Sequence, residues 1–113
     1  MIKCEFYTLG YKDRKYVATL RKGYTDAKGT LRATNPIGVD TALYYNRIGR
    51  VWYCVALSTG TAIAEGKTKD EAFHNAHTKE RAAKVQKYIQ TELYKRDVKR
   101  FNELVESLQK TQE

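Results

Sequence analysis

The sequence predicts an α+β protein, with an antiparallel sheet of about four to five short strands in residues 2–65 and helices after it. All seven glycines and the single proline lie at or before Gly66, so the last 47 residues contain no backbone breaker. Before Gly66, aromatic and β-branched residues recur between turn residues, a pattern typical of short strands. We expect one domain over residues 1–113, with a β-rich half (1–66) and a helical half (67–113).

The β-rich half is expected to contain five strands, near residues 2–8, 15–20, 41–45, 50–57 and 61–65. Turn residues predict hairpin turns at residues 46–49 and 58–60. Residues 22–40 are rich in turn residues and predict an exposed excursion, with a short strand near Leu31. A competing interpretation makes residues 41–48 a short helix that ends at the next glycine.

The helical half begins with a capping box. Thr68 can accept a hydrogen bond from the amide of Glu71, whose carboxylate can reach back to the amide of Thr68. Apolar residues recur at helical spacing over residues 72–108. They fit either two consecutive helices, about 69–94 and 97–110, or one long helix whose overhanging apolar end requires a second copy of the chain. The long helix predicts a homodimer through Val98, Phe101, Leu104, Val105 and Leu108.

The charge balance favours an acidic partner. The chain has 21 Lys and Arg against 13 Asp and Glu, a formal charge of +8, and both halves carry a basic excess. Such a surface is typical of nucleic-acid binders, although charge that serves only solubility is the alternative. No apolar run approaches the roughly 18 residues that a membrane span needs. The isolated cysteines and the lack of a signal-peptide pattern at the N-terminus indicate a cytoplasmic protein.

Two groups of residues are candidates for partner binding. On a continuous helix, one group would form a basic track for phosphates, opposite the apolar stripe: His77, Arg81, Lys84, Tyr88, Lys95 and Lys99. The other group surrounds one predicted turn and suits either base stacking or a protein interface: Tyr44, Tyr45, Arg47 and Arg50. Tyrosines are also interleaved with lysines and arginines over residues 11–24.

Catalytic and metal-binding patterns are incomplete, so we expect no enzyme, no metal and no cofactor. Glu71 and His74 match only half of a carboxylate-bridged metal site. His74 and His77 are three residues apart, whereas the histidines of helical zinc motifs are four apart. Cys54 lies in an apolar predicted strand, where a cysteine usually serves packing.

The strand-to-helix junction at residues 60–83 carries a family resemblance. The run from Gly60 to Ala72 resembles the end of the third strand and the start of the second helix in double-stranded-RNA-binding domains. That family grips phosphates with a lysine cluster at the helix start, which implies a phosphate contact for Lys69. Asp70 and Phe73 stand where other lysines of the cluster belong.

The same junction also resembles HicB-type antitoxins, partly RNase H-like domains that neutralise a toxin ribonuclease, through Gly66-x-Thr68-x-x-Glu71-Ala72-x-x-Asn75-Ala76. In general character the chain resembles bacteriophage accessory proteins, including anti-CRISPR inhibitors. We expect a non-catalytic basic protein that engages nucleic acid, or the nucleic-acid channel of a nucleoprotein complex, through charge and Tyr/Arg contacts. The alternative is a protein-directed inhibitor, anti-CRISPR-like or antitoxin-like, that blocks a nuclease by binding it directly.

Overall fold

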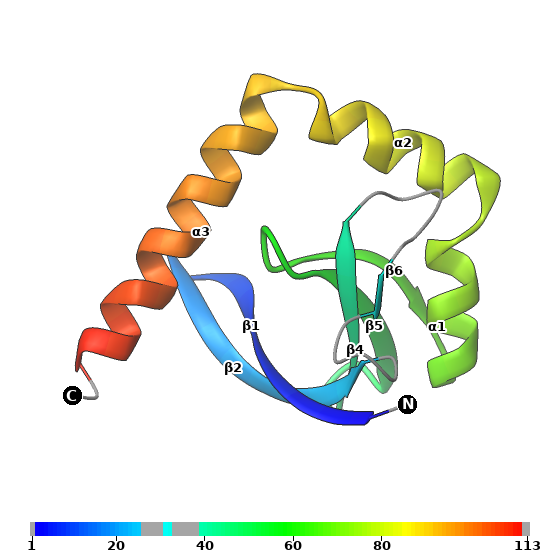
Figure 1. Cartoon of the computed structure of the whole chain (residues 1–113). Helices are drawn as coiled ribbons and strands as arrows, with labels where there is room; N and C mark the ends of the chain where they lie inside the picture. The colour runs from blue at the N-terminus through cyan, green and yellow to red at the C-terminus, as the bar shows by residue number, and fades with distance from the viewer. Residues whose placement is uncertain (1, 26–30, 33–38, 112–113) are drawn as a thin grey trace.

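The computed structural model describes residues 2–25, 31–32 and 39–111, and it confirms the α+β class (Figure 1). An antiparallel sheet with the strand order β1-β2-β4-β5-β6 packs against three helices, and the two-residue β3 pairs with β4. In chain order the elements are β1 (Ile2–Lys12), β2 (Lys15–Thr25), β3 (Leu31–Arg32), β4 (Asp40–Asn46), β5 (Val51–Ala56), β6 (Thr61–Gly66), α1 (Lys69–Ala76), α2 (Lys79–Ile89) and α3 (Glu92–Thr111). No helix among these residues is long and apolar enough to cross a membrane.

The β1–β2 hairpin is longer than its sequence pattern predicts. Its 11-residue strands pair without interruption from Ile2 and Thr25 to Lys12 and Lys15. The two-residue turn has positive φ at Asp13 and Arg14, which matches the right-handed twist of the flanking strands. Residues 11–16 are exposed, so this end of the hairpin lacks the alternation of apolar and polar residues that marks a half-buried strand.

Strands β4, β5 and β6 form a meander with turns at residues 47–50 and 57–60, close to the expected positions. Residues 41–48 do not form a helix, so that interpretation is wrong. The reason is that β4 is a central strand, with Thr41, Ala42, Leu43 and Tyr44 all buried, and successive strand residues face opposite sides of the sheet.

Threonine caps divide the helical half. Thr68 accepts a hydrogen bond from the amide of Glu71, Thr78 from the amide of Arg81, and Thr91 from the amide of Tyr94. The helix breaks therefore lie at residues 77–78 and 90–91, not near 94–97 as predicted, and the single long helix is contradicted. A threonine can begin a helix without any glycine or proline, so counting breakers misses both boundaries.

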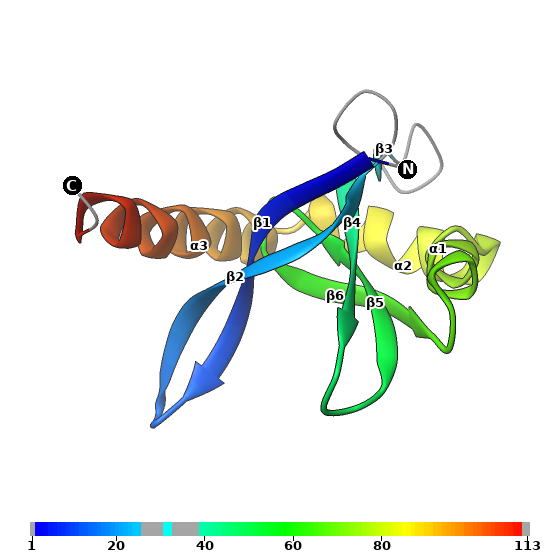
Figure 2. The ribbon, with the colours of Figure 1, turned by 90° about the horizontal axis from the view of Figure 1, so that it is seen from below.

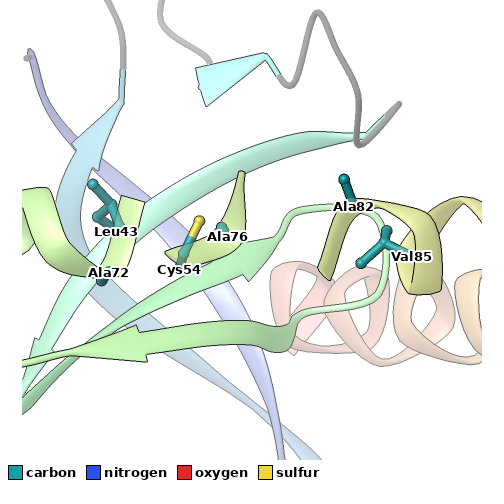
Figure 3. Close-up of a cluster of buried hydrophobic side chains, with 6 residues drawn as sticks. All are labelled: Leu43, Cys54, Ala72, Ala76, Ala82 and Val85. Atoms are coloured by element: carbon teal, nitrogen blue, oxygen red, sulfur yellow. The ribbon is translucent and has the colours of Figure 1, made fainter. Parts of the chain in front are cut away.

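The core lies on both faces of the sheet. On one face, Leu43 and Cys54 pack against small residues of α1 and α2, which let the helices approach closely (Figure 3): Ala72, Ala76, Ala82 and Val85. The other face buries Phe6, Ala42, Tyr44 and Val55.

Helix α3 crosses the β1–β2 hairpin and contacts β2 (Figure 1). Phe101 is only 4 % exposed and lies against Gly60, whose φ of +71° and lack of a Cβ make room for the ring. The guanidinium of Arg100 lies 4.0 Å from the centre of the Tyr16 ring on β2. Phe101 is buried within its own chain, whereas the other four residues of the predicted dimer surface are partly exposed, so the homodimer stays a prediction.

Candidate functional site

A notch opens where β2 diverges from the β4–β5 hairpin. Strands β2 and β4 share a single register pair, Tyr24 with Leu43, and separate beyond it. The notch has a volume of about 510 Å³ and is rich in aromatic and cationic side chains. Its lining residues are Leu20, Arg21, Lys22, Tyr24, Tyr44, Tyr45, Asn46, Arg47, Ile48 and Trp52. We call this feature the hairpin notch.

On one face of the sheet, three aromatic rings of the notch lie in contact. The ring centre of Trp52 is 5.9 Å from that of Tyr24 and 5.6 Å from that of Tyr45. Lys69, at the start of α1, places its Nζ 4.4 Å from the centre of the Tyr24 ring. Lys69 therefore lies beside the aromatic wall of the notch, while Tyr45 remains partly exposed.

On the opposite face of the sheet, the Tyr44 ring contacts the guanidinium of Arg21. Neighbouring strand residues point to opposite sides, so Tyr44 lies away from Tyr45 and is 9 % exposed. The Arg21 guanidinium lies 4.9 Å from the centre of the Tyr44 ring, and Arg21 Nε donates to Thr8 Oγ1 over 3.1 Å. Burial raises the pKa of Tyr44, so its hydroxyl stays neutral beside this guanidinium.

The β1–β2 turn and the β4–β5 turn lie at the same end of the molecule, away from α2 and α3 (Figure 2). Five exposed cations occupy these two turns and their flanks: Lys12, Arg14, Lys15, Arg47 and Arg50. We call them the tip cations, and the two turns together with the hairpin notch form the hairpin end. Asp13 is the one carboxylate in the two turns.

Among the residues that the structure describes, no ion pair involves a tip cation. Within the described ranges, the ion pairs lie on α3, where Lys95 pairs with Glu92 at 3.3 Å and Asp97 pairs with Arg100 at 3.1 Å and Arg96 at 3.7 Å. The five tip cations are exposed and lack an ion-pair partner in this part of the chain, although Asp13 adjoins two of them.

The predicted basic track is not aligned, because two helix breaks change the direction of the chain between its members. His77 is the C-cap residue of α1, and its ring stacks on Phe73 with centres 4.2 Å apart. The Tyr88 hydroxyl donates to Asp97, and Lys95 is paired with Glu92. The remaining three members of the track are exposed on α2 or α3: Arg81, Lys84 and Lys99.

A second, smaller cavity of about 240 Å³ lies under α2. Its lining is mainly apolar, from residues such as Val39, Ile63 and Val85, with Arg81 and Lys84 also contributing. These two track residues therefore lie apart from the hairpin notch, whose lining comes from β2, β4, β5 and the turn between the last two.

Cys54 is buried in β5. Burial raises the pKa of the Cys54 thiol to about 11, so the thiol is protonated at neutral pH and is a poor nucleophile. No group of three or more His, Cys, Asp or Glu side chains that could hold a metal ion occurs in this part of the chain.

No family model, curated protein or solved structure matches this chain. The resemblances to double-stranded-RNA-binding domains and to HicB-type antitoxins therefore stay predictions.

Of the predicted site residues, Tyr44, Tyr45 and Arg47 line the notch, Arg50 lies in the adjoining turn, and Lys69 contacts Tyr24 beside it. The candidate set missed seven other lining residues: Leu20, Arg21, Lys22, Tyr24, Asn46, Ile48 and Trp52. The interleaved tyrosines and cations of residues 11–24 were the signal for three of them. Nothing in the sequence pattern singled out Ile48.

Proposed function

We propose that this protein is a non-catalytic, cytoplasmic binding protein whose hairpin end engages nucleic acid. One observation carries the proposal: two projecting turns, whose cations have no ion-pair partner among the described residues, flank a notch lined with aromatic rings. Lysines and arginines bind phosphates and position a nucleic acid, while aromatic rings beside them can stack on bases.

The distribution of exposed apolar side chains supports the same end of the molecule. Seven large hydrophobic residues in the described ranges are exposed, and five of them lie on the two hairpins towards their turns: Tyr11, Tyr16, Leu20, Tyr45 and Ile48. Exposed apolar groups that gather in one region mark a binding surface more often than scattered ones do. The helical layer formed by α2 and α3 exposes one such residue, Leu93.

The test is fluorescence anisotropy with labelled DNA and RNA, single-stranded and duplex, over a range of salt concentrations. If the five tip cations meet phosphates, affinity should fall about 10²- to 10³-fold between roughly 50 and 200 mM salt. The double variant Arg47→Ala/Arg50→Ala should weaken binding about 10- to 100-fold and reduce the salt slope by about 2.

Lys95→Ala/Arg96→Ala is the matched control, because it removes two cations that are already paired with carboxylates. It should change affinity by about twofold or less. Equal losses in the two double variants, or no salt-dependent binding to any of the four nucleic acids, would overturn the proposal.

A protein-directed inhibitor, anti-CRISPR-like or antitoxin-like, is the second candidate. The contacts among Tyr24, Tyr45 and Trp52 beside Arg47 favour it, since Tyr, Trp and Arg dominate the hot spots of protein interfaces. An affinity pull-down from the native host, with and without nuclease treatment, separates the two. Capture of a nuclease or its guide complex that survives nuclease treatment and high salt, without binding to free DNA or RNA, would favour the inhibitor.

A further inference from the structure

Ile48 is the most exposed large apolar residue in the described part of the chain. Its side chain is 98 % exposed, whereas the other exposed large hydrophobics there range from 42 % to 66 %. It lies at the middle of the turn that joins β4 to β5, between Arg47 and Arg50. Water therefore surrounds an aliphatic side chain at the tip of a projecting, cationic hairpin.

The backbone at Ile48 is held in place. The Asn46 side-chain carbonyl Oδ1 accepts hydrogen bonds from the amides of Ile48, at 3.1 Å, and Gly49, at 3.4 Å. Arg50 closes the turn with a φ of +55°, and the Asn46–Val51 pair fixes its base. This Asx turn constrains the backbone from which the Ile48 side chain projects.

The other hairpin tip has different chemistry. The β1–β2 turn consists of Asp13 and Arg14, between Lys12 and Lys15, and has no apolar side chain at its tip. Its cations suit phosphates, and its nearest exposed rings, Tyr11 and Tyr16, lie behind the turn with their centres 5.1 Å apart. The two hairpins therefore differ in what they can contribute to one bound nucleic acid.

We propose that Ile48 is a wedge that inserts between stacked base pairs of duplex DNA and kinks it. This inference rests on the nucleic-acid binding proposed above. Aliphatic side chains on minor-groove-binding proteins open base steps in this way, and adjacent cations hold the phosphates on either side. Arg47 and Arg50 flank Ile48 in that arrangement, while Lys12, Arg14 and Lys15 contact the DNA beyond the kink.

Duplex DNA fits this chemistry better than duplex RNA. The wedge must reach the base steps through a groove, and B-form DNA has flexible pyrimidine–purine steps that unstack easily. Duplex RNA instead has a wide, shallow minor groove and is recognised there mainly through its shape and 2′-hydroxyls. Duplex RNA serves as a comparison substrate in the test.

The experiment measures DNA bending by energy transfer between dyes at the two ends of a duplex of about 25 base pairs that contains TA and CA steps. The wild-type protein should shorten the end-to-end distance, as expected for a kink of about 20–90°. Ile48→Ala should abolish the shortening and weaken binding about tenfold, whereas Ile48→Leu should retain most of both. Leu93→Ala, which truncates an exposed apolar residue of α3, should change neither.

Each outcome separates the two proposals. No binding to any nucleic acid overturns both. Salt-dependent binding without bending, or equal bending by wild type and Ile48→Ala, overturns the wedge and leaves nucleic-acid binding intact. Bending of duplex RNA but not of DNA also overturns the wedge as stated. Because Ile48 is almost fully exposed, Ile48→Ala should unfold at the same temperature as wild type, so a loss of bending cannot be a loss of folding.

Discussion

The hairpin end and helix α3 are both rich in cations, yet their charges have different surroundings. The five tip cations have no ion-pair partner among the described residues, whereas on α3 Lys95, Arg96 and Arg100 all pair with Glu92 or Asp97. The comparison shows that a net charge of +8 does not by itself locate a binding surface. The carboxylates that the fold brings near each cation decide how much of its charge a partner meets.

The difference follows from secondary structure. On a helix, residues three or four positions apart are neighbours, so a mixed sequence such as that of α3 pairs many of its own charges. A projecting hairpin turn has few neighbours, so its cations meet a carboxylate only if one lies within the turn. The β4–β5 turn contains two arginines and no acidic residue. Basic residues in turns are therefore better candidates for phosphate contacts than basic residues in long mixed helices.

The largest expected effect is on stability, at the point where β2 of one hairpin crosses β4 of the other. A Cβ on Gly23 would lie 1.9 Å from the Leu43 carbonyl oxygen and 2.8 Å from Phe6 Cε1. Gly23→Ala should therefore lower the free energy of unfolding by about 3 kcal/mol or more, measured by urea denaturation. In Gly10→Ala, the matched control on β1, the new methyl would meet Val17 Cγ2 at an ordinary 3.6 Å. That change should stay within about 1 kcal/mol of wild type.

If Gly23→Ala proved as stable as Gly10→Ala, the two hairpins would not depend on this close crossing. The hairpin end would then not be one fixed surface, and the contrast with the helical layer would weaken.

The sequence predicted the sheet and the Thr68 cap because both depend on local patterns. The capping box needs only Thr68 and Glu71, and a capping bond to Thr68 is present. The prediction of the later helix boundaries failed, because it counted glycines and prolines and did not use the threonines that cap α2 and α3. The breaks at residues 77–78 and 90–91 contain no glycine or proline, and the pairing of Tyr88 with Asp97 across one break cannot be deduced from helical periodicity. The basic track failed for the same reason, since it assumed one continuous helix.

The hairpin notch was only partly predictable. Tyr45 and Arg47 adjoin one turn, so sequence proximity alone grouped them. Arg21 and Trp52 join them only because β2 crosses β4 at a single register pair and then diverges. No local pattern encodes that divergence.

An intermediate effect is expected when cations of α3 lose their carboxylate partner and so become unpaired like the tip cations. The Asp97 carboxylate pairs with Arg96 and Arg100 and accepts the Tyr88 hydroxyl hydrogen bond, so Asp97→Asn leaves two cations without their partner. We expect a loss of about 1–2 kcal/mol in the free energy of unfolding. Anisotropy at low salt should show unchanged or tighter nucleic-acid binding, with a salt slope steeper by about 1. Weaker binding in this variant would mean that the carboxylate itself takes part, contrary to the comparison.

The smallest effect is a titration within the helical layer. Burial, followed by the hydrogen bond to Asp97, raises the pKa of Tyr88 to about 12, whereas an unfolded tyrosine titrates near pH 10. The folded state therefore keeps this proton longer, so the contribution of Tyr88 to stability is complete below about pH 10 and is lost as the pH rises to about 12. Ultraviolet difference titration of wild type against Tyr88→Phe should show one tyrosine ionising at the highest pH. In Asp97→Asn this pKa should fall, because the negative charge and its hydrogen bond are removed. Affinity for nucleic acid should not follow Tyr88 ionisation, since Tyr88 lies away from the hairpin notch; a matching pH dependence of binding would instead assign part of the interface to the helices.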